Sequence, residues 1–356
     1  MENRRVVLYA GRTRLVEGLS PGGRRYAVWE DIVPRLRGEL ADCVVYLYPS
    51  MLSAERGVQA GGTGFLVGVR SEAKPQIAYC YAVTNRHVVK GDPKKNGAGK
   101  APVIRLNTHD GGTDIIPNAH WKVAPAGDDI AVASISFEPS LKFRPVLLER
   151  FMTPDLIKEL GVGWGDDLFL VGRFISHAGK QRNMPVARFG AIAMMPDEPI
   201  ENDETKFQQE SFLAELHTIG GFSGSPVFIS LPQDRYIEHP QYNLEEERKR
   251  SHRSWLLGIE WCNASFLERN TGMSGVIPAW KIADLILNDE DFKMQRKRAD
   301  EKEVEQSKKS GIKLTRAAGP SQKTRAPERD DRIDIPIPTR EQFETDLGKA
   351  IRKRKD

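Results

Sequence analysis

The chain is dominated by short runs of apolar, β-forming residues that Gly, Pro and Asp separate. Runs of this kind, bounded by turn residues, are typical of antiparallel strands. Because helical patterns do not alternate with them, we expect a sandwich or barrel and not a parallel βαβ sheet. Strands are predicted at residues 44–48, 64–69, 77–83, 103–106, 121–123 and 130–135, and again at 167–172, 187–195, 211–216, 226–230, 255–261 and 275–277.

Helical patterns are few and short. Residues 153–160 form the clearest one, between the two series of strands, since Thr153 can cap a helix and Pro154 suits its first position. Residues 279–287 predict a helix after the last strand, and residues 29–40 predict a short helix near the N-terminus. The expected fold class is therefore all-β, in one folded region over residues 39–290.

Residues outside that region differ in composition. Residues 1–38 are a mixed extension to which the sequence assigns no role. Residues 291–338 are charged and poor in apolar side chains, which predicts a disordered linker. Residues 339–356 begin with a capping box and repeat apolar side chains at helical spacing, which predicts a short amphipathic helix. We expect the tail after residue 290 to bind a protein partner or to regulate the folded region.

Composition and charge exclude several classes of function. From residue 291 onward, 19 Lys and Arg stand against 13 Asp and Glu, so the basic excess lies in the tail and nucleic-acid binding by the folded region is not expected. No run approaches the roughly 18 apolar residues of a membrane span. Cys43, Cys80 and Cys262 are too few and too scattered for a disulfide framework or a zinc site. We therefore expect a cytoplasmic protein without a zinc site.

One turn has the composition of a nucleophile site. In residues 221–226, Gly-Phe-Ser-Gly-Ser-Pro, Ser223 lies between two glycines, Gly221 and Gly224, just before an apolar strand. We call this segment the serine turn. Glycines allow a tight, exposed turn in which backbone N–H groups point at a reacting carbonyl. The alternative is an ordinary loop, because Gly, Ser and Pro are the usual turn residues.

Two further positions could assist such a serine. His87 directly follows a buried strand, where an imidazole can be rigid and still face a cleft, as a general base requires. Asp128 and Asp129 precede another strand, where a carboxylate can orient an imidazole. Taken singly, such a histidine is more often structural, and such an acidic pair is more often a solvated turn.

Together these segments resemble the trypsin-like serine peptidases, in particular their bacterial HtrA-like and glutamyl-endopeptidase-like branch. The resemblance rests on the order of three motifs, residues 84–89 (Thr-Asn-Arg-His-Val-Val), 129–132 (Asp-Ile-Ala-Val) and the serine turn. Further similar segments are residues 62–67, 165–172, 258–259 and 276–278. The similarity covers roughly residues 40–290.

The resemblance implies two antiparallel β-barrels, at about residues 39–150 and 160–280, with a catalytic triad between them. Ser223 would be the nucleophile, His87 the general base and Asp129 the orienting acid, and the N–H groups of Gly221 and Ser223 would form the oxyanion hole. The resemblance implies that no metal or organic cofactor is required. Phe222 occupies the position where zymogen-activated members carry an aspartate, so activation through that residue's salt bridge is not expected.

The expected function is a serine endopeptidase that cleaves protein or peptide substrates through an acyl-enzyme, with regulation by a partner. The alternative is a non-catalytic peptide-binding or scaffold protein on the same fold, which Phe222 motivates. For substrate binding, His217 and Thr218 precede the nucleophile near the family's specificity pocket and could favour an acidic or polar side chain, although His217 could instead cap a loop. Trp261 and Asn263 would run along the substrate as an edge strand.

Overall fold

A computed structural model describes eleven segments of the chain, of which residues 5–10, 13–19 and 25–31 are the first three. The others are residues 38–91, 100–136, 140–174, 179–202, 206–216, 221–231, 254–261 and 272–309. The predicted helix at 339–356, the second half of the predicted linker, His217, Thr218 and Asn263 lie outside these segments. Among the helices described, none is long and apolar enough to cross a membrane.

The N-terminal extension contains a three-stranded antiparallel sheet of β1 (Arg5–Ala10), β2 (Thr13–Leu19) and β3 (Arg25–Asp31). The predicted helix at residues 29–40 is wrong at both ends. Trp29 lies in β3, opposite Leu15 of β2, and the 3-10 helix η1 (Gly38–Cys43) begins only at Gly38. Backbone pairing along the whole of β3 outweighs a weak local helical pattern.

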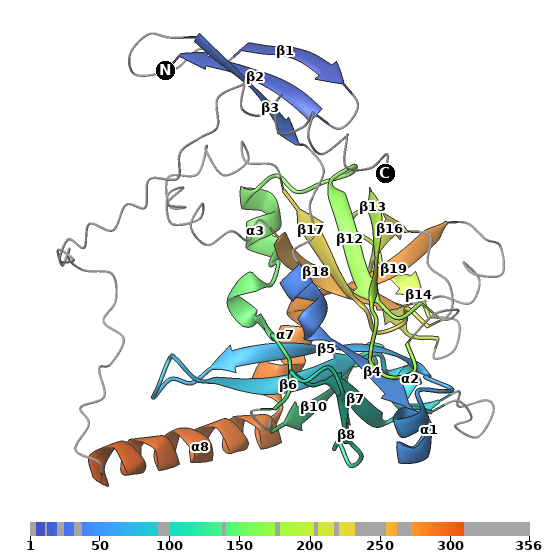
Figure 1. Cartoon of the computed structure of the whole chain (residues 1–356), viewed down its shortest axis with the longest axis vertical. Helices are drawn as coiled ribbons and strands as arrows, with labels where there is room; N and C mark the ends of the chain where they lie inside the picture. Colours follow the sequence, from blue (N-terminus) through green and yellow to red (C-terminus); the bar gives the residue numbers. More distant parts are fainter. Residues whose placement is uncertain are drawn as a thin grey trace, which may run out of the picture. The chain divides into compact units, whose positions relative to one another are not determined.

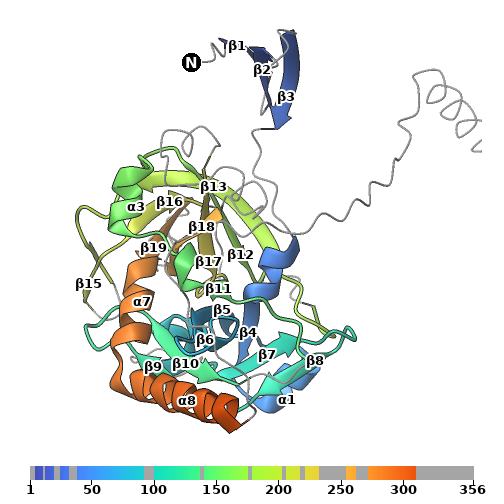
Figure 2. The same ribbon diagram turned by 90° about the vertical axis from the view of Figure 1, so that its left-hand side faces the viewer.

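The first β unit of the folded region is an eight-stranded sheet in the order β8-β7-β4-β5-β6-β10-β9, with β11 parallel to β5 (Figure 1 and Figure 2). Its strands are β4 (Val44–Tyr48), β5 (Gly62–Arg70), β6 (Ala78–Thr84), β7 (Val103–Asn107), β8 (Thr113–Ile116), β9 (Lys122–Val123), β10 (Ala131–Ile135) and β11 (Val146–Leu147). The order has two free ends, so this first of the two predicted β units is an open half-barrel. Its end strands, β8 and β9, have four and two residues, which leaves little backbone for pairing.

The second unit is a closed barrel in the order β12-β13-β16-β19-β18-β17. Its strands are β12 (Asp167–Gly172), β13 (Val186–Met194), β16 (Phe212–Glu215), β17 (Pro226–Ser230), β18 (Ser254–Trp261) and β19 (Met273–Pro278). A separate pair, β14 (Ile200–Glu201) and β15 (Gln208–Gln209), lies between β13 and β16 in sequence. Apolar residues of all six barrel strands are buried in the two larger core clusters, so the all-β prediction with two β units is confirmed.

Short helices lie between strands of the first unit and between the two units. They are α1 (Met51–Arg56), α2 (Arg86–Lys90), the 3-10 helix η3 (Leu148–Arg150) and α3 (Pro154–Glu159). In α3, the Thr153 hydroxyl accepts the N–H of Leu156 at 3.2 Å, as the capping pattern predicted. After β19 the chain forms α7 (Ala279–Asn288), which buries Ile282 and Ile286.

The disordered linker predicted from residue 291 is wrong for its first part, because Glu290–Lys309 form helix α8. This helix is polar on average, but a few of its side chains hold it against the first sheet (Figure 2). Phe292 is buried and packs edge-on against Tyr81 of β6, with ring centroids 5.1 Å apart. Arg296 donates to the Tyr81 hydroxyl, and the Asp300 carboxylate accepts from the hydroxyls of Ser71 and Tyr79. Tertiary contacts therefore stabilise a helix whose composition resembles that of a linker.

Candidate active site

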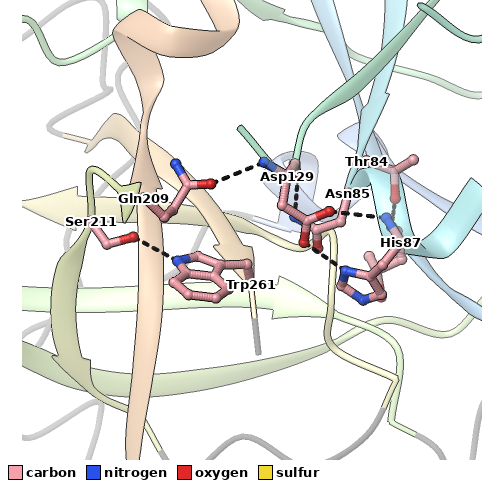
Figure 3. Close-up of polar contacts among 8 residues, drawn as sticks. Thr84, Asn85, His87, Asp129, Gln209, Ser211 and Trp261 are labelled. Atoms are coloured by element: carbon pink, nitrogen blue, oxygen red, sulfur yellow. Dashed lines mark hydrogen bonds and ion pairs between the residues drawn. The ribbon is translucent and has the colours of Figure 1, made fainter. Parts of the chain in front are cut away.

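His87 and Asp129 are brought to the same end of the first sheet by strand pairing. Strand β6 ends at Thr84, which lies opposite Ala131 of β10. The chain then turns through Asn85 into α2, which carries His87. The side-chain amide of Asn85 donates to the backbone carbonyl of Asp129 at 2.9 Å. This buried bond fixes the spacing between the turn before α2 and the start of β10 (Figure 3).

The carboxylate of Asp129 accepts two hydrogen bonds from His87. Its Oδ2 lies 2.6 Å from Nδ1 of the imidazole, and its Oδ1 accepts the backbone N–H of His87 at 2.9 Å. The side chain of Asp129 is 6% exposed, whereas that of His87 is 27% exposed. A carboxylate at this distance from Nδ1 favours the tautomer that carries its proton on Nδ1, which leaves Nε2 to accept a proton.

Gln209 of β15 supports this pair, and the sequence analysis missed it. Its Oε1 accepts the backbone N–H of Asp129 at 3.0 Å (Figure 3). Its Nε2 donates to Oδ1 of Asp128 at 2.7 Å. The same oxygen of Asp128 lies 4.0 Å from the Lys281 ammonium. The two neighbouring aspartates thus have different partners, and only Asp129 contacts His87. No local sequence signal identifies Gln209, because its contacts are about 80 residues away.

Backbone conformation and contacts with β18 shape the serine turn. Gly221 and Gly224 have φ values of 99° and 89°, which residues other than glycine rarely adopt. The N–H of Ser225 donates to the carbonyl of Phe222 at 2.8 Å, which closes a tight turn around Ser223. The N–H of Gly224 donates to Glu260 of β18 at 3.0 Å. These contacts attach the turn to the closed barrel.

Thr63 of β5 attaches the same turn to the first sheet. Its backbone N–H donates to the carbonyl of Ser223 at 3.0 Å, and its buried hydroxyl donates to the carbonyl of Gly221 at 2.8 Å. Gly224 has no room for a side chain, because a Cβ there would lie 2.0 Å from the Thr63 carbonyl and 2.4 Å from Thr84 Oγ1. The turn therefore packs against the strands that lead to His87.

A glycine on β5 shows how close Ser223 lies to α2. A Cβ at Gly62 would lie 2.8 Å from Cγ1 of Val88 and 3.3 Å from the carbonyl of Ser223. Val88 directly follows His87, so the two segments meet at Gly62. The Ser223 hydroxyl makes no hydrogen bond within the described part of the chain.

Burial separates the two serines and the phenylalanine of the turn. Ser223 is partly exposed, whereas Ser225 is fully buried and its Oγ has no hydrogen-bond partner. Phe222 is fully buried in the core cluster of the second barrel, and the guanidinium of Arg188 lies 5.7 Å from its ring centroid. An apolar side chain, and not an ion pair, thus anchors the residue before Ser223.

Two backbone donors of the turn remain available. The N–H groups of Gly221 and Ser223 take part in none of the hydrogen bonds found among the described residues, while the carbonyls of the same two residues are held by Thr63. Among those residues there is also no group of three or more His, Cys, Asp or Glu side chains that could hold a metal ion.

Of the predicted substrate-binding residues, only Trp261 can be described. It lies at the end of β18, opposite Gly275 of β19, and its side chain is buried. Its indole N–H donates to Ser211 Oγ at 2.6 Å (Figure 3). The indole is therefore part of the barrel interior, and a contact of Trp261 with a substrate would have to use its backbone.

Comparison with models of protein families agrees with this architecture. The family model of the trypsin-like peptidase domain matches residues 62–231. Among solved structures, a crystal structure of Deg5 is 15% identical, with a TM-score of 0.40, and covers 70% of this chain and 90% of its own. The inactive form of Rv3671c from M. tuberculosis H37Rv, a serine-to-alanine mutant, is 16% identical, with a TM-score of 0.36, and covers 72% and 95%. The comparison with curated proteins found no match.

Proposed function

Because this chain contains a trypsin-like peptidase domain, we propose that it is a serine endopeptidase in which Ser223, His87 and Asp129 form the catalytic triad. The observation that carries the proposal is the double hydrogen bond from His87 to Asp129, next to a serine turn that is tied to the same strands. The substrates are proteins or peptides.

In the proposed reaction, Nε2 of His87 accepts the proton of the Ser223 hydroxyl while Oγ attacks the carbonyl carbon of the scissile peptide bond. The carbonyl oxygen takes up the electron pair of its double bond and becomes an oxyanion. When the carbonyl reforms, the C–N bond breaks and His87 returns the proton to the leaving amine, which leaves an acyl-enzyme. A water molecule, activated by the same imidazole, then releases the acid product and Ser223.

Asp129 serves this cycle by holding the imidazole. Its Oδ2 fixes the proton on Nδ1 and stabilises the imidazolium that forms when Nε2 is protonated. The hydrogen bond from the backbone N–H of His87 to Oδ1 holds the carboxylate in place. The hydrogen bond from the backbone N–H of Asp129 to Gln209 connects Asp129 to β15. Burial of Asp129 excludes water that would weaken these contacts.

The oxyanion would be bound by the N–H groups of Gly221 and Ser223. The Ser223 N–H belongs to the Phe222–Ser223 peptide group, whose carbonyl accepts the N–H of Ser225 at 2.8 Å, and Thr63 holds the carbonyls of the peptide groups on either side of it. The orientation of this donor is therefore set before a substrate arrives. Donors that are oriented in advance stabilise developing charge without reorganisation. Burial of Phe222 contributes to the same end, since an apolar side chain of this size is stabilised by about 1.5–3 kcal/mol when buried. The proposed site therefore needs no ion pair at this residue.

Hydrolysis of a library of fluorogenic peptides tests the proposal. The wild type should cleave some of them, and Ser223→Ala should lower kcat by roughly 10⁶-fold. Ser225→Ala is the matched control and should retain most of the activity, because the Ser225 hydroxyl is buried without a partner. If the wild type binds peptides but cleaves none, the chain is a non-catalytic peptide-binding or scaffold protein instead.

A further inference from the structure

A buried cluster of two arginines and two tyrosines lies between the first sheet and the second barrel. We call Tyr46, Tyr48, Arg105 and Arg173 the arginine–tyrosine cluster; all four are buried, and Arg173 is the most exposed at 6%. Burial lowers the pKa of both arginines, and both lie near enough to the two tyrosines for these to offset part of that shift. Neither arginine forms an ion pair with a carboxylate of a described residue. Among the described residues, two guanidinium charges are therefore buried without an acidic partner. Burying such a charge costs free energy unless its N–H groups are satisfied by hydrogen bonds.

Arg105 is satisfied by protein carbonyls. Its Nε donates to Asn183 Oδ1 at 2.9 Å, and its Nη2 donates to the carbonyl of Gly179 at 3.0 Å. Its Nη1 donates to the carbonyls of Ala54 at 3.0 Å and Lys180 at 3.1 Å, and its guanidinium lies 4.7 Å from the ring centroid of Tyr48. These contacts are those of a structural arginine that joins β7 to neighbouring loops.

The side chain of Arg173, in contrast, has none of the hydrogen bonds that satisfy Arg105. Its side chain makes no hydrogen bond with a described residue, and its Nε is sealed from solvent without a partner. The hydroxyl of Tyr48 is also buried and unpaired. The hydroxyl of Tyr46 is buried as well, with the backbone of Met184 beside it. An unsatisfied buried donor costs about 1–3 kcal/mol, and more when it is charged.

The guanidinium of Arg173 adjoins the serine turn. A Cβ at Gly221 would lie 2.8 Å from its Nη1, so the missing side chain of Gly221 makes room for it. The backbone N–H of Arg173 donates to Thr63 Oγ1 at 3.0 Å, and the same hydroxyl donates to the carbonyl of Gly221. Arg173 and the turn are thus connected both through space and through Thr63.

The unpaired hydrogen-bond donors of Arg173 and Tyr48 indicate which chemical class of ligand could bind here. A guanidinium presents a planar fork of N–H groups that matches the two oxygens of a carboxylate or phosphate, and a tyrosine hydroxyl can donate to the same oxygens. Water could accept one of these hydrogen bonds but would leave the charge of Arg173 uncompensated. Burial lowers the pKa of Arg173, yet an arginine side chain stays protonated in proteins, so the positive charge persists.

We propose that Arg173 and Tyr48 bind an oxyanion, the carboxylate or phosphate group of a ligand, beside Gly221 of the serine turn. The bound anion would compensate the guanidinium charge and satisfy Nε of Arg173 and the hydroxyl of Tyr48. Because Thr63 links Arg173 to Gly221, the occupied site would also stabilise the turn. This binding does not depend on the peptidase activity proposed above.

Isothermal titration calorimetry with inorganic phosphate and with acetate, in chloride buffer of constant ionic strength, tests this site. We expect one site per chain for at least one probe; acetate alone would identify a carboxylate ligand, and phosphate a phosphoryl group. Arg173→Gln should weaken binding at least about tenfold. Arg70→Gln removes the same charge from an exposed arginine that pairs with Glu149, and it should bind as the wild type does.

Tyr48→Phe keeps the test decisive if Arg173→Gln does not fold. It removes a hydroxyl that has no protein partner, so the folded state should be retained while phosphate or acetate binds more weakly. Ser223→Ala should bind the anion as the wild type does, which separates this site from catalysis. Equal binding by the wild type, Tyr48→Phe and Arg173→Gln, or the absence of binding by the wild type to either probe, would overturn the proposal.

Discussion

His87 donates both its backbone N–H and its ring Nδ1–H to one carboxylate, that of Asp129. This arrangement fixes the position of the carboxylate through the backbone and the orientation of the imidazole through the ring. In the proposed mechanism, Asn at position 129 would accept the backbone N–H but would favour the wrong imidazole tautomer.

Asp129→Asn should therefore lower kcat by about 10⁴-fold while the protein stays folded. Steady-state kinetics with a cleaved peptide, together with circular dichroism, measure both effects. Asp128→Asn is the matched control, since Asp128 contacts Gln209 and not His87. Similar losses of kcat in the two variants would contradict the assignment of Asp129.

Thr63→Val should impair both the fold and the serine turn. The variant keeps the shape of the side chain but leaves the carbonyl of Gly221 without its donor and the N–H of Arg173 without its acceptor. We expect the free energy of unfolding to fall by about 1–3 kcal/mol and kcat to fall more than KM changes. Urea denaturation and peptide kinetics test this, and Thr63→Ser, which keeps the hydroxyl, should recover most of both quantities. Wild-type values for Thr63→Val would show that the hydroxyl does not hold the turn.

Gly224→Ala should prevent the turn from packing on the first sheet. The added methyl group would lie 2.0 Å from a backbone carbonyl, at a φ of 89° that alanine rarely adopts. The melting temperature should drop by several degrees, as a loss of 1 kcal/mol or more produces in a domain of this size. Gly163→Ala provides the comparison, because nothing lies within 4 Å of its Cβ position. If both variants melt at the wild-type temperature, the close approach of the turn to Thr63 is wrong.

Helix α8 should stabilise the first sheet. Phe292→Ala removes a buried aromatic ring that packs on Tyr81, and we expect it to lower the free energy of unfolding by about 3–5 kcal/mol. Met294→Ala, at an exposed position of the same helix, should have little effect. Deletion after residue 309 leaves α8 intact and should preserve stability, whereas deletion after residue 289 should reduce it. Equal stability of the two truncated chains, measured by urea denaturation, would exclude a structural role for α8.

Much of the fold could be predicted from the sequence because local patterns determine it. Strands β12 and β17 have their predicted bounds, residues 167–172 and 226–230. Each is a short apolar run with turn residues beside it, which is a local pattern. The cap of α3 by Thr153 is likewise a local interaction. That His87 follows one buried strand and Asp129 precedes another was also visible in the sequence.

The remaining features depend on contacts between distant residues. Helix α8 is held by Phe292 and Asp300 against a strand more than 200 residues away in sequence, so its own composition does not reveal it. No local sequence pattern predicts the contact of Gln209 with Asp129 or that of Thr63 with Gly221. The open edge of the first sheet depends on the short strands β8 and β9, whose pairing partners a single-strand pattern does not specify.

Peptide mapping by tandem mass spectrometry, after reaction with a fluorophosphonate, tests the central claim most directly. The account predicts one covalent adduct on Ser223 Oγ, no adduct in Ser223→Ala, and strongly reduced labelling in His87→Ala, because the imidazole must accept the hydroxyl proton. Ser225, which lies two residues away and is fully buried, should remain unmodified. An adduct on Ser225, or equal labelling of the wild type and Ser223→Ala, would contradict the proposed active site.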